Sequence, residues 1–429
     1  MTATRRRRDA AAGSAETAGA ACKRGSVCLV TETYHPEVGG GETQARLLAR
    51  GLVERGWSVR LVTRRSRRGT ARRESIDELE LRRLPPAGPG RLKKWCMAAP
   101  CLLELLRARE RYDLIFVSGF RVLGMPAMTA ARMLGRPCVL KPDSLGEMSG
   151  AWFGPGLSAS GIDAGGRTVA RLIGLRNRLL RRASAFVAIS SPIERELLDH
   201  GVAPDAIHSI PNGIDVARFT PLDGSRRGAL RAELGLPTRG VLATFTGRLV
   251  SYKGLTGLLD AWSGVLRTFP DATLQLVGSG SLDLHNVEAE LKRRVAEQQL
   301  SEHVIFTGSV DDVPRRLQAS DLFLFPVQQE AFGLALVEAM ACGLPVVTTR
   351  AGGLADIVTD GRDACTVPDD DPQQLRRTIE ALIADDDQRR RLGREARRTV
   401  QRRFGAAAVV ERYDILFRAL VGGACGPRL

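Results

Sequence analysis

The chain has 429 residues, 44% hydrophobic and 26% charged, which is typical of a globular protein and long enough for two domains. It lacks both an apolar run of the roughly 18 residues that cross a bilayer and the apolar core of a signal peptide near its start, so we expect a cytoplasmic protein. The eight cysteines are scattered without metal-ligand spacing, which favours unpaired, mostly buried thiols in a reducing compartment.

The net charge of +15 is concentrated in the first half of the chain. Residues 1–215 carry 35 Lys and Arg against 21 Asp and Glu, a net +14, whereas residues 216–429 carry 28 against 27, a net +1. This asymmetry favours an anionic partner, either nucleic acid or an acidic membrane surface, although an arginine-rich composition bias would give the same count. Aromatic residues are only 5% and are not interleaved with the basic runs, which argues against nucleic acid and for the membrane.

Residues 1–24 have no apolar periodicity and are predicted to be a disordered basic tail. A strand at 27–30, a glycine-rich loop, an amphipathic helix at 43–55 and a strand at 59–63 then form the kind of unit that builds parallel sheets. The pattern recurs with strands at 112–118, 137–141 and 183–190 and with helices at 124–135 and 191–201. The segment at 207–215 adds a short strand and an Asn-Gly turn. We expect a first domain at 25–215 and a linker at 216–240.

A second alternating series predicts another domain at 241–400. Its strands are predicted at 240–249, 272–280, 304–310, 321–327, 344–350 and 363–371, with helices at 254–270, 282–300 and 313–320 and another after 327. The run at 321–327 is almost wholly apolar, as expected of a strand covered on both faces. The predicted fold is therefore α/β, with two Rossmann-like, doubly wound domains facing a central cleft where ligands bind. Residues 401–429 contain an amphipathic helix that we expect to pack back on the first domain.

The stretch "QQEAFGLALVEAM" follows the strand at 321–327 and begins the next helix near Phe332 or Gly333. The free N–H groups of Phe332, Gly333 and Leu334, together with the helix dipole, form a phosphate site. Glu338 lies one to two turns into the helix, where its carboxylate can accept hydrogen bonds from two hydroxyls, such as those of a ribose. Glu330 precedes the helix and faces whatever extends beyond the phosphate. An isolated pair of this kind would more often be a capping residue and a solvated helix position.

Two cations follow the end of the strand at 240–249. Arg248 and Lys253 point at the same crevice, where they can neutralise a diphosphate and the negative charge that develops as it leaves. Either residue alone would ordinarily be a solvated surface charge. Their placement opposite a helix N-terminus with a glutamate pair favours a binding site.

From Ser26 to Leu420 the chain resembles the retaining glycosyltransferases of family 4, which have the GT-B fold of two facing Rossmann-like domains. The most specific match is "SDLFLFPVQQEAFGLALVEAMACGLPVVTTRAGGLADIV" at 320–358, which looks like the nucleotide-sugar site with its two-glutamate motif. The segments "GRLVSYKG", "LVGSGS", "VIFTGSVDDV", "IPNGIDVARF" and "PEVGGGETQ" are also similar.

The resemblance implies transfer of a sugar from a UDP-, GDP- or ADP-sugar to a hydroxyl of a lipid-linked or polysaccharide acceptor, with retention of the anomeric configuration. It implies no metal and no cofactor, because Arg248 and Lys253 hold the diphosphate. The Asp runs at 369–371 and 385–387 are accordingly interpreted as helix caps and solvated surface.

The resemblance also assigns residues around the cleft. Glu338 would hold the ribose hydroxyls, Glu330 the transferred sugar near its reacting carbon, and the backbone near Val310 the base. In the first, acceptor-side domain, the residues Gly39, Gly40 and Gly41 would let the donor phosphate and the acceptor approach.

The chain departs from the family pattern after the strand at 137–141. Many members carry a histidine there, whereas this sequence has Lys141, Pro142 and Asp143. Either Lys141 or Asp143 supplies a different polar contact, or the loop belongs to a subgroup with another donor. A buried or surface Lys-Asp ion pair is the structural alternative. His35, beside the glycine loop, is a further acceptor-side candidate, although a lone loop histidine more often satisfies local hydrogen bonds.

The segment at 90–113 combines basic residues with large apolar ones, as an element lying on an anionic membrane leaflet does. The basic residues are Lys93, Lys94, Arg107, Arg109 and Arg111, and the apolar ones Trp95, Met97, Leu102, Leu103 and Leu106. A packed helix with a basic exterior is the alternative, and Pro100 interrupts the pattern. Residues 146–182 are predicted to be a mobile acceptor loop beside it.

We therefore expect an enzyme peripheral to the inner face of the plasma membrane. A nicotinamide-dependent oxidoreductase is disfavoured, since "GGGETQ" and "GSGSLD" lack the third glycine and no acidic residue ends the strand at 59–63. A nucleotide-sugar epimerase of related fold is the closer alternative. A nucleic-acid binder would rest on charge alone.

Overall fold

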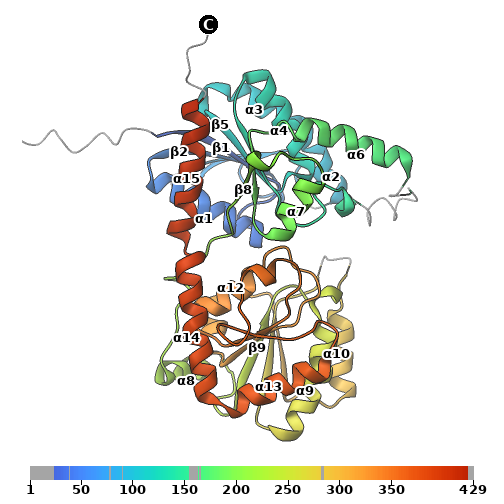
Figure 1. Cartoon of the computed structure of the whole chain (residues 1–429), viewed down its shortest axis with the longest axis vertical. Coiled ribbons are helices and arrows are strands. Elements are labelled where there is room, and N and C mark those ends of the chain that lie inside the picture. The colour runs from blue at the N-terminus through green and yellow to red at the C-terminus, as the bar shows by residue number, and fades with distance from the viewer. Residues whose placement is uncertain are drawn as a thin grey trace, which may run out of the picture.

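The computed structural model describes residues 24–37, 39–76, 79–88, 90–153, 163, 166–281 and 285–423. Two α/β domains stack along the long axis of the molecule, and α14 (Asp386–Arg403) and α15 (Ala406–Gly423) run along one side of both (Figure 1). The tail predicted at 1–24 lies outside the described residues, apart from Arg24.

The N-terminal sheet has eight strands in the order β3-β4-β2-β1-β5-β6-β7-β8, and every pair is parallel except β3 with β4. The strands are β1 (Gly25–Thr31), β2 (Trp57–Arg64), β3 (Arg73–Ile76), β4 (Leu79–Leu84), β5 (Leu114–Ser118), β6 (Cys138–Lys141), β7 (Ala185–Ala188) and β8 (Ile207–Ser209). The helices are α1 (Gly40–Glu54), α2 (Arg91–Cys96), α3 (Ala98–Arg107), α4 (Phe120–Leu134), α6 (Arg167–Leu180) and α7 (Ser191–Asp199), with short 3-10 turns η1 (Arg109–Arg111), η2 (Ala151–Phe153) and η3 (Pro204–Ala206). The chain reverses its direction of strand addition between β1 and β5, so the loops after these strands meet at one edge.

The C-terminal sheet is wholly parallel, in the order β11-β10-β9-β12-β13-β14. The strands are β9 (Leu242–Thr246), β10 (Thr273–Val277), β11 (Val304–Gly308), β12 (Leu322–Phe325), β13 (Val346–Thr348) and β14 (Cys365–Thr366). The helices are α8 (Gly224–Glu233), α9 (Leu255–Thr268), α10 (Glu288–Glu297), α11 (Val313–Gln318), α12 (Leu334–Ala341) and α13 (Pro372–Ala384), with η4 (Ser251–Lys253) and η5 (Gly352–Asp356). This is the Rossmann strand order, in which ligands bind beyond the carboxyl ends of the two strands at the switch point, here β9 and β12. The predicted fold class is confirmed.

The segment predicted as a linker contains a helix. Asp223 caps α8, with its side chain accepting a hydrogen bond from the Arg226 N–H at 2.9 Å. Leu230 and Leu236 then pack in one apolar cluster with Leu242 of β9. Residues around α8 therefore belong to the body of the C-terminal domain, which the high charge of the segment obscured. The region predicted as a loop at 146–182 likewise includes a helix, α6, and most of its apolar side chains are not buried in the core. Residues 154–162 and 164–165 lie outside the described part.

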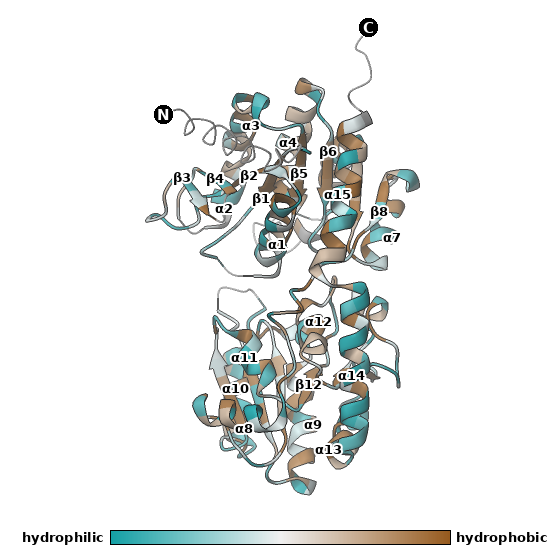
Figure 2. Ribbon diagram, turned by 90° about the vertical axis from the view of Figure 1, so that its left-hand side faces the viewer, coloured by the Kyte–Doolittle hydropathy of each residue, from teal (hydrophilic) through white to brown (hydrophobic). Residues whose placement is uncertain are grey.

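The last helix, α15, returns to the N-terminal domain. Five of the six apolar positions of its amphipathic pattern are buried in the cluster beneath β1, β2 and β5: Val409, Val410, Tyr413, Leu416 and Phe417. The Phe417 ring lies 6.0 Å from Trp57 and 5.6 Å from Phe116, between centroids. Apolar residues concentrate on the strands and on the inner faces of the helices, whereas α14 is strongly hydrophilic (Figure 2).

The described cysteines are free thiols, four of them buried, as the sequence predicted. Asp371 and Asp385 accept hydrogen bonds from Gln374 and Gln388 N–H groups at 2.8 Å and so cap α13 and α14, as expected of the Asp runs. In the part of the chain that the structure describes, none of the helices has the length and apolarity to span a bilayer.

Candidate active site

The switch point of the C-terminal sheet brings Lys253 and Glu330 together. The Lys253 Nζ atom lies 2.6 Å from Glu330 Oε2, although the residues are 77 positions apart in the chain. Their side chains are only 10% and 19% exposed, so the ion pair is largely shielded from water. The ammonium group also lies 5.4 Å from the centroid of Phe325 in β12, and the other Glu330 oxygen accepts a hydrogen bond from the Ala331 N–H at 3.1 Å. The sequence predicted both groups at one crevice but did not predict their pairing.

Arg248 occupies the loop after β9 and is exposed. Its Nη2 donates to the Tyr252 hydroxyl at 2.8 Å, and the guanidinium lies 6.0 Å from the centre of the same ring. Tyr252 thereby holds Arg248 beside Lys253, whose ammonium is 5.6 Å from that ring. Two positive charges at the carboxyl end of β9 are suited to a diphosphate.

The helix α12 begins with Leu334, and Gly333 is its N-cap. Gly333 has φ +111, and a Cβ atom there would lie 2.4 Å from the Leu354 side chain, so a side chain is excluded. Across the cleft, a Cβ atom on Gly40 would lie 2.9 Å from Leu334 Cδ1. The glycine loop and the start of α12 are thus in contact, and the structure joins the two halves of the predicted site. The predicted residue Val310 follows β11 at the same carboxyl edge and is half-buried.

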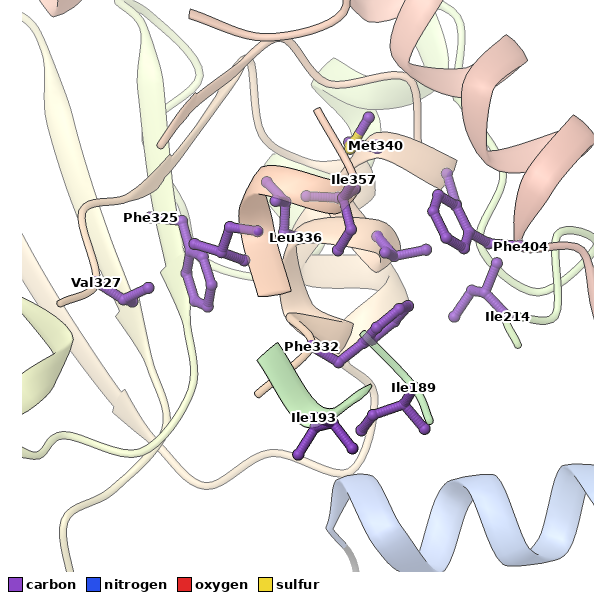
Figure 3. Packing of buried hydrophobic residues seen from close by; sticks show 14 of the residues in the cluster. Ile189, Ile193, Ile214, Phe325, Val327, Phe332, Leu336, Met340, Ile357 and Phe404 are labelled. Carbon is purple, nitrogen blue, oxygen red and sulfur yellow. The ribbon is translucent and has the colours of Figure 1, made fainter. Parts of the chain in front are cut away.

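Phe332 points away from this cleft. Its side chain is 4% exposed and packs edge-on against Phe404, with ring centroids 5.8 Å apart. Figure 3 shows the ring beside Ile189 and Ile193 of the N-terminal domain. The side chain therefore belongs to an apolar junction between the domains, and only its backbone can contribute to the phosphate site.

Glu338 lies in the second turn of α12 and is partly buried. Burial raises the pKa of Glu338 from its usual 4.5 to about 7, against an opposing effect of the nearby Arg218 guanidinium. The sequence analysis did not single out Arg218 as a neighbour of Glu338, although it lies within the quoted segment "IPNGIDVARF". A carboxyl group with this pKa changes between proton donor and acceptor around neutral pH.

On the acceptor side, Lys141 and Asp143 form an ion pair at the end of β6. Asp143 also accepts a hydrogen bond from the Ser118 hydroxyl at 2.9 Å, and a Cβ atom on Gly41 would lie 3.5 Å from its Oδ2. Lys141 is 3% exposed, whereas Asp143 faces the glycine loop. The structure thus shows Lys141 and Asp143 as an ion pair. The Asp143 carboxylate nevertheless lies beside the glycine loop.

Two more carboxylates that the sequence analysis did not assign lie near the glycine loop. Glu42 accepts a hydrogen bond from the Thr33 hydroxyl, and burial raises the pKa of Glu42. A Cβ atom on Gly39 would lie 2.5 Å from Glu42 Oε2. Glu32 pairs with Lys94 of α2 at 2.5 Å. His35 is exposed, and its carbonyl accepts from Arg83 at 2.9 Å.

Comparison with known proteins matches both domains. The model described as "Glycosyl transferase 4-like domain" matches residues 39–213, and "Glycosyl transferases group 1" matches 226–399. The D-inositol 3-phosphate glycosyltransferase of Nocardiopsis dassonvillei is 31% identical over 366 residues, 80% of this chain and 82% of the relative. The mannosylfructose-phosphate synthase of Agrobacterium fabrum is 28% identical, covering 80% of each chain.

Solved structures agree with the fold. The sucrose-phosphate synthase of Thermosynechococcus elongatus has a TM-score of 0.77 at 24% identity, covering 93% of this chain and 100% of that one. Anabaena HepE, solved with UDP and glucose, has a TM-score of 0.73 at 21% identity, covering 92% and 99%. Two facing Rossmann-like domains of this kind form the GT-B fold. The chain belongs to the group 1 glycosyltransferases of the family 4 type.

Proposed function

We propose that this glycosyltransferase moves a sugar from a nucleotide diphosphate sugar to an acceptor hydroxyl with retention of configuration and without a metal ion. The observation that carries the proposal is the Lys253–Glu330 pair at the switch point, with Arg248 beside it and the glycine loop facing it. The presence of UDP and glucose in the HepE structure supports a nucleotide-sugar donor. Retention and independence from metal rest on the family resemblance and on the two cations.

In the proposed reaction the bond between the anomeric carbon and the diphosphate breaks, and the acceptor oxygen forms a new bond to that carbon from the same face. The acceptor proton leaves with the diphosphate. Arg248 and Lys253 stabilise the charge on the leaving group. Glu330, released from Lys253 as the diphosphate arrives, contacts the sugar.

Other groups of the site bind the rest of the donor in this proposal. The amides at Phe332, Gly333 and Leu334 hold a phosphate, Glu338 the ribose hydroxyls and the backbone near Val310 the base. In the first domain Gly40 and Gly41 give room to the donor phosphate.

The proposed acceptor is a lipid-linked or glycan hydroxyl, bound on the side of Gly39, His35, Lys141 and Asp143. The carboxylates of Glu42 and Asp143 can accept hydrogen bonds from sugar hydroxyls. Two of the relatives are an inositol 3-phosphate glycosyltransferase and a mannosylfructose-phosphate synthase, so a small phosphorylated sugar or polyol is the second acceptor class to test.

One assay tests the proposal. The protein is incubated with a panel of UDP-, GDP- and ADP-sugars together with membrane lipid extract, a glycan or inositol phosphate, and nucleotide release is measured. We expect release that depends on the lipid or glycan, with a retained anomeric linkage in the product. An inverted linkage would contradict retention, and release that yields a free epimerised sugar without any acceptor would favour the epimerase.

Substitution of Glu338 tests its assignment to the ribose. Glu338→Ala is expected to weaken nucleotide binding by about 1–3 kcal/mol, because two hydroxyls lose their acceptor. The ionised carboxylate is the better acceptor, so wild-type affinity should rise with pH through about 7, and Glu338→Gln should abolish this dependence. Calorimetric titration with UDP at several pH values measures both effects; a pH-independent wild-type affinity would contradict the assignment.

The raised pKa of Glu338 also makes the free energy of unfolding depend on pH. The folded protein keeps a proton on Glu338 that the unfolded chain has lost between pH 4.5 and about 7. The contribution of this group to the free energy of unfolding therefore falls as pH rises through that window.

The proposed peripheral membrane site is supported mainly by α6, and in the segment first predicted at 90–113 by the half-exposed Trp95 and Leu103. Met97, Cys101 and Leu105 are buried in the core, so that face of α3 packs inward. In contrast, α6 extends from the domain (Figure 1) and exposes 62% of Leu172 and 66% of Leu175. Residues 167–182 contain six arginines and no acidic residue. A helix with these properties fits an anionic cytoplasmic leaflet.

The α2 helix adjoins this surface. Trp95 is 50% exposed and lies 5.4 Å from the Phe153 ring, and the Arg176 guanidinium lies 5.5 Å from the same ring. Through Phe153, the exposed Trp95 thus lies close to Arg176 of α6.

Membrane binding by α6 can be measured by flotation with phosphatidylglycerol vesicles. The double variant Leu172→Glu/Leu175→Glu is expected to bind about tenfold or more weakly, because two apolar side chains no longer insert and two negative charges are added. Met133→Glu on α4, where the methionine is 65% exposed, is the matched control and should bind like the wild type. Equal losses in both variants, or unchanged binding by the double variant, would contradict the assignment.

A further inference from the structure

The N-terminus of α7 in the first domain is hydrogen-bonded to two segments of the second domain. The Ser190 hydroxyl donates to the Ala331 carbonyl at 2.6 Å. The Ser191 N–H and hydroxyl donate to the two carboxylate oxygens of Asp356 at 2.6 and 2.9 Å. We call these four residues, Ser190, Ser191, Ala331 and Asp356, the interdomain clasp.

The clasp acts on the peptide next to Glu330. Ala331 follows Glu330 directly, and its N–H donates to Glu330 Oε1 at 3.1 Å while its carbonyl accepts from Ser190. Ala331 therefore connects Ser190 of the first domain to the Glu330 carboxylate, which pairs with Lys253. Movement of α7 would tilt this peptide and turn the Glu330 side chain.

The two C-terminal segments that the clasp contacts are locked to each other. The Gly353 N–H donates to the Glu330 carbonyl at 3.0 Å. Gly352, with φ +58, passes so close that a Cβ atom there would lie 2.1 Å from the Glu330 carbonyl oxygen. Asp356 lies in the same short turn, η5, as Gly352. The two C-terminal residues of the clasp, Ala331 and Asp356, therefore belong to segments that are hydrogen-bonded to each other.

The surroundings favour a defined geometry at this contact. Phe332 packs on Phe404, and Ile189 and Ile193 of the first domain are 4% and 1% exposed at the same junction (Figure 3). The Asp356 carboxylate at the start of α7 is favoured by the positive end of the helix dipole. The junction between the domains thus combines apolar packing with the directional hydrogen bonds of the clasp.

We propose that Ser190 and Ser191 are positioning residues, through which the first domain orients Glu330 towards the donor sugar only when the two domains are correctly apposed. This inference rests on the role proposed for Glu330. The orientation of the Glu330 carboxylate then depends on the contact between the domains, because separating the domains breaks the Ser190–Ala331 hydrogen bond.

The test uses the full chain and three serine substitutions. Ser190→Ala is expected to lower kcat about tenfold, to leave the calorimetric Kd for UDP within about twofold, and to be rescued by Ser190→Thr, which keeps the hydroxyl. Ser209→Ala is the matched control: its hydroxyl donates to Glu194 within the first domain at 2.7 Å, and Ser209 lines the same interdomain groove as Ser190. It should leave kcat unchanged.

Hydrogen exchange of the peptide covering 328–334 provides a readout without substrate. Ser190→Ala should accelerate exchange there by about tenfold, whereas Ser209→Ala should not. Unchanged exchange and kcat in Ser190→Ala, or equal effects in the control, would overturn the proposal. Failure of the proposed function would show differently, as absence of sugar transfer by the wild type, and the exchange result would still decide whether the clasp orders the loop.

The other half of the clasp is tested by a double-mutant cycle. Ser191→Ala removes the hydroxyl bond to Asp356 and keeps the N–H bond, whereas Asp356→Ala removes both. Each should accelerate exchange in the 328–334 peptide, and adding Ser191→Ala to Asp356→Ala should have little further effect. Additive effects would overturn the assignment of this pair.

Discussion

Replacing Glu330 by glutamine is expected to lower kcat by about 10²–10³-fold, the size of effect seen when one preorganised electrostatic contact to a transition state is lost. The amide has the same shape as the carboxylate, so the loop that carries it should remain folded. Lys253 loses its partner at 2.6 Å but keeps its contact with the Phe325 ring, which leaves the ammonium available to the diphosphate. Nucleotide affinity should therefore stay within a few-fold of the wild type.

Steady-state kinetics with the best donor and calorimetric titration with UDP measure these two quantities separately. Glu338→Gln is the matched control, since it makes the same chemical change eight residues further on, and it should reduce nucleotide affinity more than kcat. If both substitutions reduce nucleotide affinity equally, the division between a sugar-facing and a ribose-facing glutamate is wrong.

The C-terminal sheet could be predicted from the sequence nearly strand by strand, because its strands are short apolar runs between glycines and charged turns. The edge hairpin of β3 and β4 was missed. In β3, Arg73–Ile76 is almost wholly exposed and carries no apolar alternation. The neighbouring β4 does alternate, with Leu79 and Leu81 buried around the exposed Glu80, but three of its six residues are charged. The helices α6 and α8 were missed for a related reason. Few of their side chains are buried, so their sequences give little indication of a face that packs on the core.

The sequence predicted which residues meet at the candidate site, but it did not predict how their side chains pair. Arg248, Lys253 and Glu330 each follow a strand that ends at the switch point, which strand order alone brings together. The pairing of Lys253 with Glu330 and the clasp at Ala331 depend on how two loops and two domains meet. Such contacts span from 25 to 165 positions in the chain, from Ser118–Asp143 to Ser191–Asp356, and leave no local pattern.

In the proposed mechanism, the ion pair keeps two opposed charges in place before the donor binds. Each group satisfies the other while the donor is absent, which avoids a shielded, unpaired charge. The proposed function then has the arriving diphosphate offer Lys253 a second anion and free Glu330 for the sugar. On this proposal the pair couples donor binding to exposure of the carboxylate.

Lys253→Met should consequently be the most damaging single change at the site. It removes one of two cations from the proposed diphosphate contact and leaves Glu330 as an unpaired anion facing the same phosphates. We expect UDP affinity to fall by about 2–5 kcal/mol, as for truncation of one partner of a shielded, hydrogen-bonded charge pair, and kcat/KM to fall by at least 10³-fold. The methionine keeps the length of the side chain and its contact with Phe325, so packing is preserved.

The double variant Lys253→Met/Glu330→Gln separates the two causes of this loss. Removal of the opposing anion should restore part of the UDP affinity, because the repulsion between Glu330 and the phosphates is gone, but not kcat, because both charges that act on the transition state are missing. Calorimetry and turnover measured on the two single variants and the double variant complete the cycle. If the double variant binds UDP no better than Lys253→Met, Glu330 does not face the diphosphate, and the coupling between donor binding and the release of Glu330 must be abandoned.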